Sequence, residues 1–72
     1  MAKYWIHEYL MLMDFATDSR LAAQSLAIQA KYESDPHKAM EYDYQYAAEL
    51  AKALHYITRA RKLRKEATKY GY

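Results

Sequence analysis

The sequence predicts an all-α fold, a helical hairpin of two long antiparallel helices, from three observations. The only proline, Pro36, lies almost at the midpoint of the 72 residues. The only other strong helix breaker is Gly71, so about thirty residues on each side of Pro36 contain neither Pro nor Gly. Residues that favour helices, such as Ala, Leu, Lys and Glu, dominate both halves. We therefore expect a single domain over residues 1–72, with a helix over 3–33, a turn at 34–35 and a helix over 36–69.

The helix expected over residues 3–33 is apolar on most of its circumference. One stripe at helical spacing consists of Trp5, Tyr9, Leu12, Ala16, Ala23, Ala27 and Ala30. A second flank consists of Ile6, Leu10, Met13, Leu21, Ile28 and Tyr32, and Met11, Phe15 and Leu26 extend the other edge. One neighbouring helix covers only one side of such a helix. The sequence thus predicts self-association, and the simplest arrangement is a homodimer in which two hairpins form a four-helix bundle.

Two short segments decide how these helices begin and end. Asp35, directly before Pro36, is suited to cap the second helix, because Asp accepts hydrogen bonds from first-turn amides and Pro fits the first helical position. Gly71 is suited to end the same helix. A kink or break at Thr17-Asp18-Ser19 is the alternative, since these residues favour caps over helix interiors. No glycine, proline or capping box supports that three-helix variant.

The helix expected over residues 36–69 has a narrower apolar stripe. The stripe consists of Met40, Tyr44, Ala47, Leu50, Ala51, Leu54 and Ile57. The solvated face opposite it carries Lys38, Glu41, Gln45, Glu49, Lys52 and Arg59, and the phasing turns Asp43 inward. The bulky flanks remain for a second interface. We expect that dimer interface to contain Ile6, Leu10, Met13, Leu21, Ile28, Leu50, Leu54 and Ile57.

Composition excludes several classes of function. The chain has no cysteine, so it has neither disulfides nor thiolate metal ligands. The three histidines are scattered, and the sequence has neither a cysteine nucleophile nor a phosphate-binding loop. We expect no enzymatic activity, no metal and no cofactor. No signal-peptide pattern or apolar run long enough to cross a membrane is present, which favours a cytoplasmic location.

Two groups of residues are candidates for binding a partner. Six cations and one anion give the last fourteen residues a net charge of +5, and Arg61 and Arg64 continue the angular positions of the apolar stripe. Such a cluster fits an acidic protein surface, a nucleic acid or simply the helix dipole. The chain also has nine tyrosines against one phenylalanine. Tyr42, Tyr44 and Tyr46 near the turn, with Trp5 and Tyr9 at the other end, are the aromatic candidates, either as core or as partner contacts.

These features predict a non-enzymatic module that binds another protein, with a small dimeric nucleic-acid-binding protein as the alternative. With its two helices around Asp35-Pro36, its lack of cysteine and its surplus aromatic surface, the chain resembles the small helical-hairpin proteins with which bacteriophages inhibit host proteins, such as quorum-sensing anti-activators. The resemblance covers the whole length as architecture and transfers no functional residue. It implies binding to a host regulatory or motor protein. A designed hairpin would share the architecture, although the tyrosines and Asp43 are irregular for an idealised design.

Overall fold

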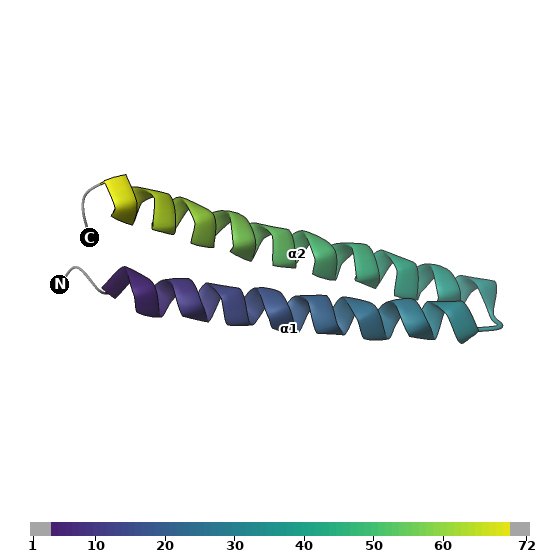
Figure 1. Cartoon of the computed structure of the whole chain (residues 1–72). Helices are drawn as coiled ribbons and strands as arrows, with labels where there is room; N and C mark the ends of the chain where they lie inside the picture. Colours follow the sequence, from purple (N-terminus) through teal and green to yellow (C-terminus); the bar gives the residue numbers. More distant parts are fainter. Residues whose placement is uncertain (1–3, 70–72) are drawn as a thin grey trace.

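The computed structural model describes residues 4–69 and forms a two-helix antiparallel hairpin (Figure 1). Helix α1 spans Tyr4–Tyr32 and helix α2 spans Pro36–Lys69. The Cα atoms occupy a rod of 54 × 14 × 11 Å, in which α1 begins and α2 ends at the same end. The expected hairpin is confirmed, with α1 ending one residue earlier than predicted. Gly71, the predicted cap of α2, lies outside the described residues.

Asp35 caps α2 as its position before Pro36 predicts. The amide of His37 donates to Oδ1 of Asp35 at 3.0 Å, and the amide of Ala39 donates to the Asp35 carbonyl at 2.9 Å. The Asp35 amide in turn donates to Oε1 of Glu33 at 3.1 Å. The turn therefore satisfies backbone groups at the start of α2 that would otherwise lack a helical partner.

Helix α1 is continuous through Thr17-Asp18-Ser19, so the two-helix prediction is confirmed over the three-helix alternative. The hydroxyl of Thr17 donates to the carbonyl of Met13 at 3.0 Å, the bond by which a threonine is accommodated inside a helix. Ser19 is buried against α2, where its small side chain fits between the helices.

The two helices meet along a seam that repeats every seven residues, as in a coiled coil. Its positions alternate at spacings of three and four, and every side chain on them is buried or half-buried. In α1 they are Trp5, Tyr9, Leu12, Ala16, Ser19, Ala23, Leu26 and Ala30; in α2 they are Ala39, Tyr42, Tyr46, Glu49, Ala53, Tyr56, Ala60, Leu63 and Ala67. The fully buried residues are mostly alanines, and Ala60 is 0% exposed. Small side chains let the helices approach closely along this seam.

The seam corrects the predicted facing of α2. The stripe through Met40, Tyr44, Leu50 and Leu54 is exposed instead of facing α1, and Leu54 is 63% exposed. Ala47 and Ala51 are exposed as well, and Ile57 is half-buried.

The polar residues of α2 shift with the same rotation. Glu49, expected on the solvated face, lies half-buried in the seam, where its Oε1 is 3.6 Å from Nζ of Lys52. Asp43, expected to point inward, is exposed. In α1 the predicted stripe is confirmed except at Ala27, which is exposed.

Candidate functional site: an apolar face of the hairpin

One side of the hairpin is identified by a groove and an aromatic contact. Glu8 and Leu12 of α1 line the groove together with Arg59, Lys62, Leu63 and Glu66 of α2, and its volume is about 260 Å³. On the same side, the rings of Phe15 and Tyr56 lie with their centroids 5.5 Å apart. We call this the groove side. At its α2 edge it is polar, with Lys38, Gln45, Lys52 and Arg59 spaced seven residues apart.

The opposite side of the seam carries apolar residues from both helices, and in α1 the polar residues Thr17, Arg20 and Gln24 lie among them. This side is defined by the seven-residue repeat. The positions four residues after Tyr9 and Ala16 in α1, and four residues after Tyr46 and Ala53 in α2, lie away from the groove. Its members are Ile6, Leu10 and Met13 from α1 and Leu50, Leu54 and Ile57 from α2, with Leu21 and Ile28 on its outer edge. We call this set the apolar face. It is the set that the sequence predicts as the dimer interface, brought together from both helices.

The apolar face is exposed in the single chain. Leu10 is 55% exposed, Leu21 58% and Ile28 59%, and Ile6 and Leu50 are also exposed. Several large apolar side chains exposed on one side of a small protein are typical of interaction surfaces. The hairpin alone buries few large side chains, since none of the described ones is completely enclosed.

The predicted aromatic contacts divide between the seam and the surface. Tyr42 and Tyr46 are half-buried in the seam, and Trp5 packs edge-to-face against Tyr9 with ring centroids 6.0 Å apart. These four residues act mainly as hairpin core. The indole Nε1 of Trp5 is buried and finds no hydrogen-bond partner. Tyr44, in contrast, is 79% exposed.

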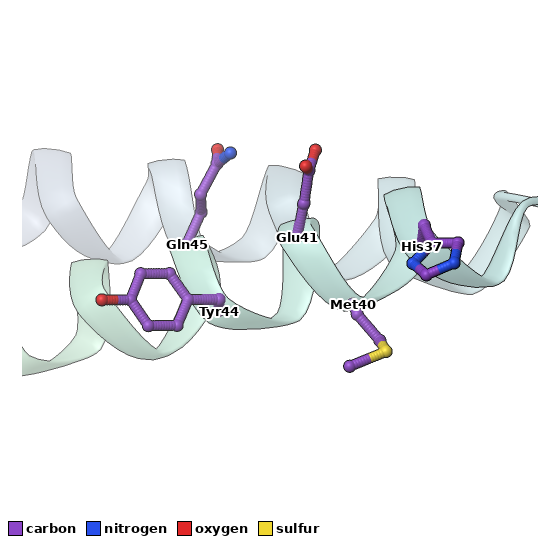
Figure 2. A pocket seen from close by; sticks show the side chains of 5 residues that line it. All are labelled: His37, Met40, Glu41, Tyr44 and Gln45. Atoms are coloured by element: carbon purple, nitrogen blue, oxygen red, sulfur yellow. The ribbon is translucent and has the colours of Figure 1, made fainter.

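Tyr44 lies in an open pocket near the turn, on the outside of α2 (Figure 2). The pocket is lined by His37, Met40, Glu41, Tyr44 and Gln45, and its volume is about 620 Å³. Figure 2 shows Glu41 and Gln45 extending together on one side of the helix and Met40 on the other, with Tyr44 between them. All five residues come from one helix, so this surface is open and suits a macromolecular contact rather than an enclosed small ligand.

The basic residues at the end of α2 are distributed around the helix. Arg61 and Arg64 lie beyond Ile57 on the side of the apolar face, whereas Arg59 and Lys62 line the groove with Glu8 and Glu66. All of these cations are exposed. They are therefore split between two sides and do not form one continuous strip.

The described residues contain no group of three His, Asp or Glu side chains close enough to hold a metal ion. Neither α1 nor α2, over the part described, has the length and hydropathy of a membrane-crossing segment. Comparisons with protein-family models, with curated proteins and with solved structures find no match for the chain. The geometry of the hairpin itself therefore carries the functional argument.

Sequence reasoning missed Ala60 and Ala67 as residues that close the hairpin. Ala53, Ala60 and Ala67 are buried at intervals of seven residues, and no larger apolar residue shares their phase except Leu63 and the tyrosines. The spacing of these alanines was the available signal. Ranking the faces of α2 by the size of their apolar residues selects the apolar face instead.

Proposed function

We propose that this chain is a non-enzymatic protein–protein interaction module, a small homodimer that binds another protein and inhibits or modulates it. The observation that carries the proposal is the apolar face, where exposed side chains from both helices form one surface. Burying apolar area stabilises association by roughly 25 cal/mol per Å² before the costs of association are subtracted. A second copy of the hairpin supplies a matching surface, and the product is a four-helix bundle.

The proposed contact to a partner protein is the surface around Tyr44. This side chain projects from the outer side of α2, beside Met40 and close to the turn. Tyrosine is enriched at binding hot spots because it brings a large apolar ring and a polar tip. Methionine adapts to irregular surfaces. A host regulatory or motor protein, as the likeness to phage hairpin inhibitors implies, is the class of partner that we propose.

Self-association is tested by light scattering coupled to size-exclusion chromatography at micromolar chain concentration. We expect a mass of two chains, each of 8.5 kDa. A single-chain mass at all accessible concentrations would contradict the proposal.

Partner binding is tested by quantitative capture from the native host. A protein retained by the wild type and by Lys52→Ser, but lost with Tyr44→Ser, supports the Tyr44 surface. Lys52 is the matched control because it is exposed on the same helix but belongs to the groove side. Equal capture by both variants contradicts this part of the proposal.

The basic end of α2 supports nucleic-acid binding as the second candidate function, since its exposed arginines and lysines are suited to phosphates. Anisotropy of a labelled oligonucleotide separates the two candidates. Binding through phosphate neutralisation falls by orders of magnitude, roughly 10³ for six contacts, between 50 and 200 mM salt. A protein contact through apolar side chains responds weakly to the same change.

A further inference from the structure

The apolar face of α2 is bounded by opposite charges. Asp43 lies at its end near the turn, and Arg61 and Arg64 lie at its other end. All three side chains are exposed, and Leu50, Leu54 and Ile57 lie between them. The face therefore has an acidic end, an apolar middle and a basic end.

These residues are placed symmetrically about one point of α2. Asp43 and Arg64 are separated by three heptads, Leu50 and Ile57 by one, and both pairs have their midpoint between Ala53 and Leu54. At the helical rise, Asp43 and Arg64 are about 31 Å apart along the axis. A two-fold axis through the midpoint, perpendicular to the helix, brings Asp43 of each copy to Arg64 of the other. The same axis pairs Leu50 with Ile57 and Leu54 with its own copy.

Helix α1 follows the same symmetry. The contact between Phe15 and Tyr56 sets the register of the hairpin and places Thr17 level with Leu54. Asp14 and Arg20, both exposed, lie three residues on either side of Thr17. The axis that relates the two copies of α2 thus also brings Arg20 of one copy to Asp14 of the other.

We infer that the occupant of the apolar face is a second copy of this chain in the antiparallel orientation, with the turn of each hairpin at the open end of its partner. This inference rests on the proposed self-association and adds its orientation and its charged contacts. The apolar residues from Ile6 to Ile28 extend about 33 Å along α1 at the helical rise, more than half the 54 Å length of the rod, so a second hairpin has a long surface to cover.

The opposite orientation, with both turns at one end, requires a two-fold axis along the rod. That axis lays α2 of each copy over α1 of the other, so Asp43 no longer meets Arg64 of its partner and the complementary charge contacts are lost. The arrangement of charges on the face therefore selects the antiparallel pairing.

The first test measures the distance between the two turns. Ser34→Cys introduces a single thiol in the exposed turn of a chain that has no cysteine, and a spin label on it reports the distance by pulsed electron resonance. Antiparallel copies place the labels roughly 55–60 Å apart, as the helical rise from the midpoint to the turn requires. A distance below about 30 Å, as adjacent helices at one end give, overturns the orientation and leaves self-association standing.

Light scattering on the same labelled sample tests self-association separately from the orientation of the two copies. A two-chain mass with the long distance supports both self-association and its orientation. A one-chain mass without intermolecular coupling contradicts the proposed function itself, and the inference falls with it.

The second test exchanges the charges. Asp43→Arg and Arg64→Asp are each expected to raise the dimer dissociation constant by about tenfold or more. The double variant D43R/R64D restores both pairs and returns the constant to within about threefold of the wild type. Failure of the double variant to recover, with helix content retained by circular dichroism, overturns the Asp43–Arg64 contact.

Glu41 and Lys62 serve as matched controls. Each lies two residues before a test position, on the other side of α2. Glu41→Arg and Lys62→Asp make the same changes of charge at exposed positions off the apolar face. We expect both to leave the dissociation constant within about threefold of the wild type. Equal effects of the control and test variants mean that net charge, not pairing, governs association, and they contradict the inference.

Discussion

The ring of Phe15 contacts the ring of Tyr56, with centroids 5.5 Å apart and planes inclined by 48°. This is the aromatic contact that the described residues make between α1 and α2, and it fixes which residues of the two helices lie level. Tilted aromatic pairs contribute about 0.5–1.5 kcal/mol beyond their buried area. We expect a double-mutant cycle of Phe15→Ala and Tyr56→Ala, followed by urea unfolding at one chain concentration, to give a coupling of that size. Additive effects of the two substitutions would show that the rings do not contact each other in solution.

Ala60 is the most completely buried described residue, and no space is left for a larger side chain there. Ala60→Leu forces the helices apart, and we expect it to lower the free energy of unfolding by about 1–3 kcal/mol. Ala51→Leu is the control, because Ala51 is exposed on the same helix and Leu has nearly the helix propensity of Ala. Urea denaturation distinguishes the two variants. Equal stability would place Ala60 outside the seam.

Asp35 holds the start of α2 through the hydrogen bond from the His37 amide. Asp35→Ala removes the acceptor and is expected to lower the free energy of unfolding by about 1 kcal/mol. Asp35→Asn keeps an acceptor oxygen and retains most of that stability. Thermal unfolding followed by circular dichroism measures both variants. A loss as large for Asp35→Asn as for Asp35→Ala means that the charge, rather than the cap, matters.

Glu49 is the acidic side chain within the seam of α2, between Tyr46 and Ala53. A half-buried carboxylate at a seam position costs stability, and its contact with Lys52 is a surface pair of little value. We therefore expect Glu49→Leu to raise the free energy of unfolding by about 1 kcal/mol. Glu41→Leu, at an exposed position, changes it by less than about 0.5 kcal/mol. If Glu49→Leu instead lowers the free energy of unfolding, the prediction is wrong, and the Glu49 carboxylate makes a favourable contact that is absent from the single hairpin.

Leu10 lies on the apolar face and is 55% exposed in the single chain. Leu10→Asp places a charge where we propose that a second copy packs, so we expect the dimer dissociation constant to rise at least about tenfold. Lys52→Asp, on the groove side, leaves it nearly unchanged. Sedimentation equilibrium measures both constants. Similar values for the two variants refute the assignment of the apolar face.

The sequence was sufficient for the topology because the evidence for it is local. Pro36 and Asp35 act on their own turn, and the absence of Gly and Pro elsewhere leaves each helix uninterrupted. The stripe of α1 was also predictable, since Trp5, Tyr9 and Leu12 share it with the alanines. These residues satisfy both rules of burial, apolar character and correct spacing.

The facing of α2 was not predictable from hydropathy, because two apolar stripes compete on that helix. Leu50 and Leu54 offer more apolar area than Ala53 and Ala60, yet the alanines face α1. Close approach of two backbones favours small side chains, whereas the large ones of α2 remain exposed. The sequence analysis places Leu50 and Leu54 both in the stripe that faces α1 and in a second interface, and the structure leaves them exposed.

The seam of alanines has a consequence for how much of this protein persists in a cell. Methyl groups contribute little cohesion, so a lone chain is held together weakly, and under the proposed self-association it would gain much of its stability by pairing. Its lifetime would then depend on its own abundance, because scarce copies would open and be cleared by proteases, whereas plentiful copies would protect one another. The buried alanines would thereby make the stability of the protein depend on its concentration.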